Sequence, residues 1–547
     1  YCQKEGIIHL KNICLPPLPE IIKYSDNQLQ RKGVAGIGIF DDPDNQLQSV
    51  AEVDIAGRNT LIIGSAQFGK TNLLQLIIRN IAETNTPKES VIYILDFGSM
   101  FLKNFEKLNH VGGVVCSSED EKLKNLFKML FAEIKNRKEI LVSAGVSSFA
   151  SYLEAGYTDL PHIYLMVDNM TALMELYLQN DDSFLNIVRE GLAVGISVIV
   201  ANAQTSGIGF RYMSNFANKI ALYCNDSNEY INLYEHFSLQ PDEKPGRCIL
   251  EIDKNIFECQ SYLAFPGERE IERIQEMHDF ISAINAGNPG MQARIIPCIP
   301  AVLPICDLYK DFLAEQKEYK LPVGLTYNEV SPYYLDLANL GILGLCGKKN
   351  TGHRNFIKCI YSYLESRKSE CPAKIVVFDD VKRRFAELKT NVLTDLYTLD
   401  MEQVKSVIEE WHEVLTKRYE EMLASENSAG SSELLLMIIQ NNDAAKVLSD
   451  DIGLMEKFND ITSRYKGMNV AIIFTNYPNN SISYDAPEPI RMIKQERHCL
   501  FFEDLDNLKS FDVPYDALRA NKKSLELGDA YYIRDNEVVK LKMAMAE

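Results

Sequence analysis

The sequence predicts an α/β protein with two tandem domains, each built on a mainly parallel sheet covered by helices. Short runs of Val, Ile and Leu alternate with longer amphipathic stretches, which is typical of parallel strands buried on both faces. Three landmarks also recur later in the chain at one constant spacing, which indicates an internal duplication. The pairs are Pro17 and Pro300, Gly64 and Gly347, and Asp96 and Asp379.

The two copies are expected to meet at the segment Ile284–Gln292, because its Gly-Asn-Pro-Gly core is typical of a linker. We therefore expect domains at residues 1–285 and 291–547, after a proline-stiffened lead-in at 7–22. Strands are expected at 59–64, 90–98, 163–168, 196–204 and 219–224, and in the second copy at 340–347, 374–380, 434–440 and 470–476. Long helices are expected at 120–141 and 410–423.

Composition narrows the class of protein. The net charge of −19 argues against a protein that coats nucleic acid or an anionic membrane nonspecifically. Twelve cysteines are scattered without zinc spacing, so free thiols are expected. No apolar run approaches the roughly 18 residues that a membrane helix needs. The chain begins at Tyr1 without a signal peptide, so we expect a cytoplasmic fragment whose upstream part is missing.

The most specific motif lies between the first strand and the first helix. Residues 61–71 read LIIGSAQFGKT and contain G-x-x-x-x-G-K-[ST]. In such a loop backbone N–H groups bind the phosphates, and the lysine contacts oxygens of the β and γ phosphates. The threonine hydroxyl is a ligand of Mg²⁺. The motif predicts P-loop NTPase domains and a site for ATP and Mg²⁺. The site is formed by Gly64, Ser65, Ala66, Gln67, Phe68, Gly69, Lys70 and Thr71.

A second acidic element is predicted at Asp168, where the strand in PHIYLMVDNM ends. P-loop ATPases use such a carboxylate to hold the magnesium water shell, and a following Glu activates the attacking water. Here the next residue is Asn169, whose amide cannot accept a proton as a carboxylate does. We therefore expect Lys70 and Asp168 to support ATP binding, and hydrolysis by the isolated domain to be slow.

Two further polar residues are weaker candidates for a catalytic role. Gln204 ends the strand in ISVIVANAQ, where a sensor of the γ-phosphate would lie, although strand-end polar groups are common. Lys219 precedes the strand of KIALYC, in a region where neighbouring subunits of a ring could supply an arginine finger. Lysine lacks the bidentate fork of arginine, so a solvated surface lysine is an equal alternative.

The second copy carries a degenerate phosphate loop, GKKNTGHR at residues 347–354. Gly347 and Gly352 remain, but His353 and Arg354 stand where the first copy has lysine and threonine. His is short and mostly neutral near pH 7, and Arg cannot hold Mg²⁺. The first interpretation is that this loop has lost its function, and the alternative is that His353 acts as a catalytic base.

The second acidic element is lost as well. Gln440 aligns with Asp168 and Asn441 with Asn169, and the same offset aligns Thr475 with Ala203. Without the lysine, threonine and aspartate, no Mg·ATP site is expected in the second copy. It is predicted to be a pseudo-ATPase.

These motifs carry a resemblance to a known family. GSAQFGKT, MVDNM, GLAVGISVIVANAQ and NFANKIALYCND resemble the FtsK/SpoIIIE motor family. Within it, ICLPPLPEI, GIFDDPDNQLQ, ILDFGSM, LNHVGGVV and KPGRCILEI are similar to the tandem ATPases of type VII secretion, the EssC/EccC type. The resemblance covers nearly the whole chain and implies two FtsK-like (RecA-like) domains, the second and third ATPase domains of such a protein.

The resemblance also implies partners and a location. It implies membrane helices upstream, a possible homo-hexamer, contacts with other membrane components of the secretion system, and recognition of helical-hairpin (WXG-type, Esx) substrates by the terminal domain. Three positions depart from active motors: Asn169 replaces Glu, the run Ala203-Gln204-Thr205 replaces Thr-Gln-Arg, and Lys219 replaces the finger arginine. All three weaken the case for rapid hydrolysis.

The leading hypothesis is an ATP-binding cytoplasmic part of a secretion motor. The first alternative is a DNA translocase of the same superfamily, which the net charge and the absence of a basic tail disfavour. The second alternative is a scaffold in which bound nucleotide only fixes the domain geometry and neither copy turns ATP over.

Overall fold

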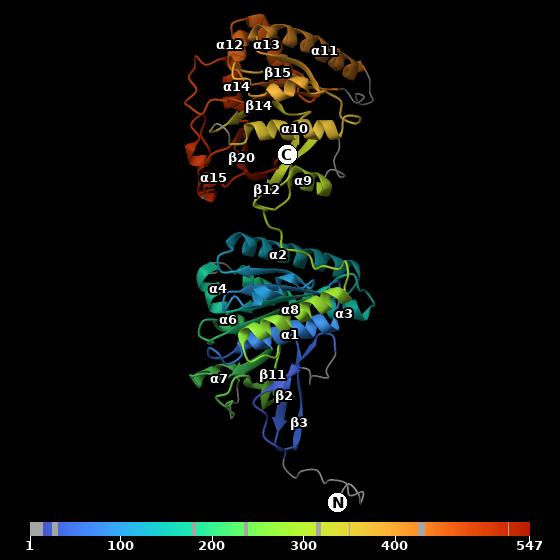
Figure 1. Ribbon diagram of the computed structural model, residues 1–547, viewed down its shortest axis with the longest axis vertical. Helices are drawn as coiled ribbons and strands as arrows, with labels where there is room; N and C mark the ends of the chain where they lie inside the picture. Colours follow the sequence, from blue (N-terminus) through green and yellow to red (C-terminus); the bar gives the residue numbers. More distant parts are fainter. Residues whose placement is uncertain are drawn as a thin grey trace, which may run out of the picture. The chain divides into compact units, whose positions relative to one another are not determined.

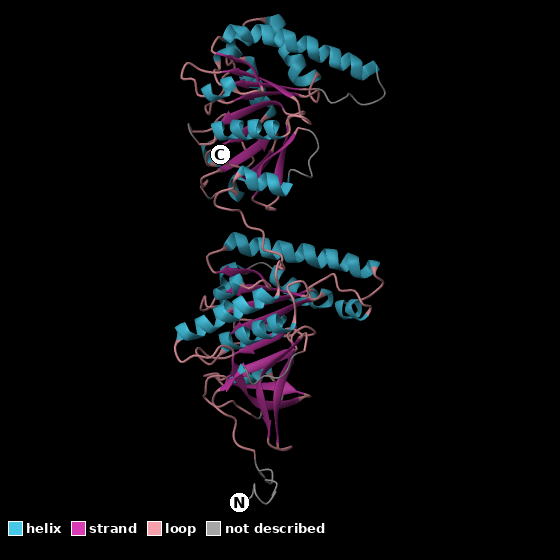
Figure 2. Ribbon diagram, turned by 45° about the vertical axis from the view of Figure 1, so that its right-hand side comes forward, coloured by secondary structure: helices cyan, strands magenta, loops and turns pink. Residues whose placement is uncertain are grey.

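The chain forms two α/β units, residues 1–298 and 299–547, which we call the first and second unit. The computed structural model describes residues 15–24, 31–177, 182–234, 239–312, 319–348, 351–424, 433–522 and 524–546. In each unit helices cover both faces of a sheet whose central strands are parallel (Figures 1 and 2). The predicted fold class, two tandem α/β domains with mainly parallel sheets, is confirmed.

The sheet of the first unit has a parallel centre and an antiparallel extension. The strand order is β3-β2-β11-β10-β9-β4-β8-β7-β5-β6, and β1 pairs with β11. The strands from β9 to β6 run parallel, whereas β2, β3, β10 and β11 form an antiparallel end that reaches past the helices (Figure 2). The strands are β1 Ile22–Lys23, β2 Val34–Asp42, β3 Leu47–Asp54, β4 Thr60–Ile63, β5 Ser90–Asp96, β6 Val111–Cys116, β7 His162–Asp168, β8 Ile196–Asn202, β9 Asn218–Leu222, β10 Arg247–Ile252 and β11 Asn255–Leu263.

Two apolar cores lie on opposite faces of this sheet. Alternate residues of β4 point to opposite faces: Leu61 belongs to one core and Ile62 to the other. Helices α1 and α8 supply one core, and α2, α4 and α5 supply the other. The helices are α1 Lys70–Thr84, α2 Asp120–Ser143, α3 Phe149–Glu154, α4 Met170–Tyr177, α5 Ser183–Glu190, α6 Phe210–Met213, α7 Asn228–Leu233 and α8 Glu270–Gly287.

The boundary between the units lies later than the linker prediction placed it. Helix α8 runs into the segment Ile284–Gln292, and the chain then returns to the first unit. The N–H groups of Ala293 and Ile296 donate to the carbonyls of Asn109 and Gly112 at 2.8 and 2.9 Å. The first unit therefore extends to residue 298 instead of 285, because these extended residues add backbone hydrogen bonds beside β6.

The second unit repeats the topology of the first. Its strand order is β13-β12-β21-β20-β19-β14-β18-β17-β15-β16, and the same positions are parallel and antiparallel. This agreement is what an internal duplication produces. The strands are β12 Lys320–Thr326, β13 Pro332–Asp336, β14 Gly341–Cys346, β15 Ala373–Phe378, β16 Thr394–Thr398, β17 Leu434–Ile439, β18 Val470–Phe474, β19 Cys499–Phe501, β20 Asp529–Arg534 and β21 Glu537–Met543.

Helices again cover both faces of the second sheet. Side chains of α11 to α14 pack in one core and those of α10 in the other. The helices are α9 Ile305–Phe312, α10 His353–Ser366, α11 Val404–Ala424, α12 Asp443–Ser449, α13 Ile452–Asn459, α14 Glu488–Glu496 and α15 Tyr515–Ala520. Trp411, the one tryptophan of the sequence, lies on α11 and is 4% exposed.

Two expectations about composition can be compared with the described part of the chain. None of its helices combines the length and apolar character that crossing a bilayer requires. All ten cysteines in the described ranges are free thiols, and no group of three or more His, Cys, Asp or Glu in these ranges could hold a metal ion. The first half of the predicted lead-in at 7–22, residues 7–14, lies outside the described residues.

Candidate nucleotide-binding site

The phosphate loop leaves the carboxyl end of the central strand β4. All four residues of β4 are buried between β8 and β9, and α1 begins at Lys70 directly after the loop. Gln67 and Gly69 have φ values of 70° and 110°, in the left-handed region. A Cβ on Gly64 would lie 2.7 Å from Leu222 Cβ, so glycine is required where the loop passes β9.

Lys70 and Thr71 lie at the positions that the motif predicts. The Lys70 ammonium donates to the carbonyl oxygens of Gly64 and Ser65 at 2.7 and 2.8 Å, so it lies within the loop. Burial lowers the pKa of Lys70, and the nearby Asp168 opposes this shift. The Thr71 hydroxyl donates to Asp168 Oδ2 at 3.2 Å. Sequence positions almost a hundred residues apart thus form one polar cluster.

Asp168 shares its strand edge with a second carboxylate. Asp96 at the end of β5 pairs in register with Asp168 at the end of β7. Asp168 is 4% exposed and Asp96 is fully buried, where it accepts hydrogen bonds from the N–H groups of Met100 and Leu102. Burial and then the charge of Asp96 raise the pKa of Asp168 to about 6. A site with two close carboxylates favours a bound cation.

Residues directly next to strands β9 and β10 contact the phosphate loop. Ser65 N–H donates to the Tyr223 carbonyl at 2.9 Å, and Gly246 N–H donates to the Phe68 carbonyl at 2.9 Å. The rings of Phe68 and Tyr223 lie 4.7 Å apart. These contacts fix the tip of the loop, while Ala66 and Gln67 remain exposed.

Asn169 is engaged with the backbone. It has φ 71°, a conformation that Asn tolerates better than Glu does. Its Nδ2 donates to the Phe97 carbonyl at 3.3 Å, and its Oδ1 accepts from Ala172 N–H in the first turn of α4 at 3.3 Å. This residue therefore caps a helix instead of presenting a general base.

The two weaker candidates have different positions. Gln204 is exposed just beyond the carboxyl end of β8, on the edge of the sheet that carries the loop. Lys219 lies near the amino end of β9, and its ammonium donates to the Leu233 carbonyl at 2.8 Å. The structure thus does not bring Lys219 to the phosphate loop of its own unit, and a role for it in a neighbouring subunit stays a prediction.

Sequence reasoning missed two residues of the site. In the sequence Asp96 is a landmark of the repeat, and its place at a strand end, like that of Asp168, is a signal for a site residue. Asn202 at the end of β8 accepts from Thr171 N–H at 3.1 Å and donates to the Gln204 carbonyl at 2.6 Å. It ties the start of α4 to the segment that carries Gln204, and a buried asparagine gave no signal for this.

The degenerate loop of the second unit keeps two glycines of the motif but not its polar residues. Gly347 and Gly352 have φ values of 134° and 149°, and a Cβ on Gly352 would lie 2.6 Å from the ring of Phe502. Burial lowers the pKa of His353 to about 4, so its imidazole is neutral near pH 7. Arg354 Nε contacts Glu387 Oε1 at 2.5 Å.

The fold and the two loops define a tandem P-loop NTPase region with one intact and one degenerate site. Residues 30–236 match the FtsK/SpoIIIE family, which confirms the predicted family resemblance and implies ATP as the nucleotide. The chain is 24% identical over 554 residues to the ESX secretion system protein YukB of Bacillus subtilis (strain 168). That match covers 99% of this chain and 36% of YukB, so the chain spans about a third of this relative's length.

Solved structures share the fold of the whole chain. EssC (ATPases 2 and 3) from Geobacillus thermodenitrificans matches with a TM-score of 0.82 at 23% identity, over 97% of this chain and all of that one. Thermomonospora curvata EccC (ATPases 2 and 3), in complex with a signal sequence peptide, matches with a TM-score of 0.61 at 20% identity over 97% of each chain. The predicted similarity to type VII secretion ATPases of the EssC/EccC type is confirmed.

Proposed function

We propose that the chain is the cytoplasmic tandem-ATPase part of a type VII protein secretion translocase. The observation that carries the proposal is similarity to YukB over 99% of the chain, together with a complete phosphate loop in the first unit. In this proposal the first unit binds Mg·ATP, and the second serves substrate recognition or assembly. Membrane helices would precede residue 1, and the full protein would assemble as a homo-oligomer.

The residues of the first unit fit Mg·ATP. The Lys70 ammonium now contacts two loop carbonyls, and it would exchange them for β and γ phosphate oxygens. The Thr71 hydroxyl and the Asp168 carboxylate lie 3.2 Å apart, and they would supply the oxygen ligands that Mg²⁺ prefers. The ion would neutralise phosphate charge, and backbone N–H groups at the start of α1 would hold the β-phosphate.

Hydrolysis is proposed to be slow in this part of the protein. Asn169 caps α4 and cannot take a proton from water, and Lys219 is held by Leu233. The same observation favours a second candidate function, a nucleotide-dependent scaffold in which bound ATP fixes the geometry of the first unit without being cleaved.

The proposed partners are helical-hairpin Esx substrates and other membrane components of the secretion system. The EccC structure in complex with a signal sequence peptide supports this proposal, because it spans the same two domains. Recognition of the C-terminal signal of such substrates is assigned to the second unit, since its degenerate loop frees it from ATP turnover.

Nucleotide binding by the purified chain tests the proposal. Lys70→Ala should abolish ATP binding measured by calorimetry with Mg²⁺, whereas Lys88→Ala, which removes an exposed lysine of the same unit, should leave it unchanged. Unchanged affinity in Lys70→Ala would place the high-affinity site elsewhere. A second measurement separates secretion from DNA translocation. If the chain serves secretion, it should bind an Esx signal peptide and should show no steeply salt-dependent affinity for DNA.

A further inference from the structure

The peptide bond between Gln204 and Thr205, just beyond β8, is held from both sides. The Gln204 carbonyl accepts a hydrogen bond from Asn202 Nδ2 at 2.6 Å. The Thr205 N–H donates to Glu229 Oε2 at 2.6 Å, and both of these residues are buried. A peptide bond is planar, so fixing its oxygen and its N–H fixes the direction in which the chain leaves Gln204. We call Asn202 and Glu229 the peptide clamp.

Asn202 joins the peptide clamp to the phosphate loop. Its backbone carbonyl accepts from the N–H of Gly64, the first residue of the loop, at 3.2 Å. Its side-chain Oδ1 accepts from the Thr171 N–H at the start of α4 at 3.1 Å. One buried asparagine thus connects the phosphate loop, helix α4 and the segment of Gln204.

Glu229 holds the same peptide bond from helix α7. The recorded hydrogen bond of this buried carboxylate comes from a backbone N–H, not from a basic side chain. Burying a carboxylate without a partner is costly, so this bond restrains both groups. Asn232 of the same helix adds a second bond, from its Nδ2 to the Thr205 hydroxyl oxygen at 2.9 Å. Helix α7 therefore fixes the backbone on the far side of Gln204.

The side chain of Gln204 remains available to a ligand although its backbone is fixed. The residue is exposed, and its Oε1 accepts from the Ser206 hydroxyl at 3.4 Å, a long bond that a ligand can replace. Strands β4 and β8 are parallel neighbours, so Gln204 follows β8 at the same edge of the sheet where the loop follows β4. A side chain on a fixed backbone loses less freedom when it binds a ligand.

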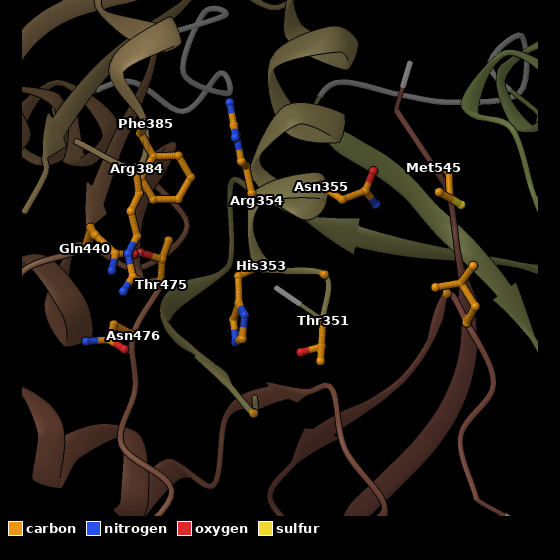
Figure 3. Close-up of a pocket in the computed structure, with 14 residues that line it drawn as sticks. Thr351, His353, Arg354, Asn355, Arg384, Phe385, Gln440, Thr475, Asn476 and Met545 are labelled. Carbon is orange, nitrogen blue, oxygen red and sulfur yellow. The ribbon is translucent and has the colours of Figure 1, made fainter. Parts of the chain in front are cut away.

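Strand register gives the counterparts of these residues in the second unit. Ala201 lies opposite Asp168, and β17 and β18 place Thr475 opposite Gln440 in the same way. Figure 3 shows Gln440 and Thr475 together on one side of a pocket, and the Thr475 hydroxyl donates to Gln440 Oε1 at 2.6 Å. Thr475 is therefore the counterpart of Ala201, and not of Ala203 as the sequence alignment predicted.

The second unit does not keep this arrangement. Counted from Thr475, Asn476 stands at the position of Asn202, and Pro478 stands at the position of Gln204. Proline has no side-chain amide that could donate to a phosphate oxygen. In the described part of the chain, the clamped glutamine thus accompanies the intact phosphate loop and is missing beside the degenerate one.

We propose that Asn202 and Glu229 are positioning residues that hold Gln204 against the γ-phosphate, so that the first unit distinguishes ATP from ADP. The proposal rests on the Mg·ATP site proposed above and adds the residues that make it selective. Gln204 Nε2 would donate to a γ-phosphate oxygen, which ADP lacks. Without the Glu229 carboxylate, the Thr205 N–H would be buried without an acceptor, and the peptide bond would turn away from its present direction.

The ratio of the dissociation constants for ADP and ATP, measured by calorimetry on the whole chain with Mg²⁺, tests this proposal. Gln204→Ala should weaken ATP binding at least about tenfold and leave ADP binding unchanged, because a hydrogen bond to a charged phosphate is lost. Glu229→Met should weaken ATP binding alone at least about fivefold. Glu229→Gln removes the same charge but keeps an acceptor for the Thr205 N–H, so it should retain most of the preference for ATP.

A double variant and a matched control separate positioning from other effects. Adding Glu229→Met to Gln204→Ala should cause no further loss, since the glutamate acts through the glutamine. Glu276→Met removes an exposed glutamate of the same unit on α8 and should change neither affinity. Binding of ADP shows that a variant keeps its phosphate loop. If Glu229→Met does not bind ADP, Asn232→Ala takes its place and should weaken ATP binding alone at least about twofold.

Three results would overturn the proposal while ADP still binds. They are an unchanged preference for ATP in Gln204→Ala, an unchanged preference in the variant of α7, or an equal loss in Glu229→Gln and Glu229→Met. Failure of the unmodified chain to bind either nucleotide would instead refute the proposed ATP site, and the peptide clamp would then have no γ-phosphate to position.

Discussion

Replacing Asn169 with glutamate separates ATP binding from ATP cleavage in the first unit. Glutamate would supply the carboxylate that can accept a proton from the attacking water. The structure also predicts a cost, because the residue has φ 71° and its side chain caps the first turn of α4. The substitution should therefore raise turnover and lower stability at the same time.

The size of each effect follows from the geometry. A left-handed conformation costs glutamate about 1 kcal/mol, and loss of the helix cap about 1 kcal/mol more, so unfolding should become easier by about 2 kcal/mol. Positioned general bases contribute roughly 10²- to 10⁴-fold to rates, so an imperfectly placed one should still raise turnover at least about tenfold. Asn169→Gly is the control, since glycine accepts φ 71° and lacks a base.

Phosphate release and thermal unfolding followed by circular dichroism measure the two effects. Asn169→Glu should hydrolyse ATP faster than the unmodified chain, and Asn169→Gly should not. Equal turnover of all three proteins at equal ATP affinity would refute the idea that the missing carboxylate limits hydrolysis. Equal stability of the Glu and Gly variants would refute the conformational argument.

Three further predictions concern stability. Arg137→Met should lower the free energy of unfolding of the first unit by about 3–5 kcal/mol in urea, because this fully buried guanidinium pairs with a glutamate and donates to three carbonyls. Gly352→Ala should cost the second unit about 1–3 kcal/mol, read from Trp411 fluorescence, since the new methyl would meet an aromatic ring at 2.6 Å. Burial lowers the pKa of His498 to about 3, below the unfolded value of 6.5. The buried neutral imidazole therefore contributes its full stability above pH 6.5. This contribution is lost as the pH falls below 6.5, because the unfolded chain then binds a proton that the folded unit does not. Between pH 6.5 and 4.5 the loss should be about 2.5 kcal/mol, and His498→Gln should remove that part of the pH dependence.

The central strands of each sheet could be predicted from the sequence, and the strands toward its two edges could not. Strands such as β4 and β7 are buried on both faces, so apolar runs mark them. Strand β3 has a half-exposed pattern, and β6 contains Gly112 and Gly113, so neither reads as a continuous apolar run. The same limit hid the end of the first unit, because residues 293–298 pack on it without forming a regular element.

The candidate site was predictable where a motif fixes both residue type and spacing. Lys70, Thr71 and Asp168 lie together because parallel strands end at one edge of the sheet. Lys219 lies near the amino end of its strand. Because parallel strands all end at one edge of the sheet, their amino ends lie at the opposite edge, away from the phosphate loop. Asp96 and Asn202 depend on register and burial, which one sequence does not reveal.

The second unit shows which features of a phosphate loop report on nucleotide chemistry. Its glycines persist although its lysine, threonine and aspartate are gone. The reason is the packing of the loop, because a Cβ on Gly347 or Gly352 would come too close to Phe502. Gly64 is constrained in the same way by Leu222 of the equivalent strand end. The glycines are therefore required by the packing of the loop against the neighbouring strand, and they do not indicate which ligand the loop binds. Only the polar residues distinguish the two loops: lysine and threonine follow the second glycine in the first unit, and His353 and Arg354 follow it in the second.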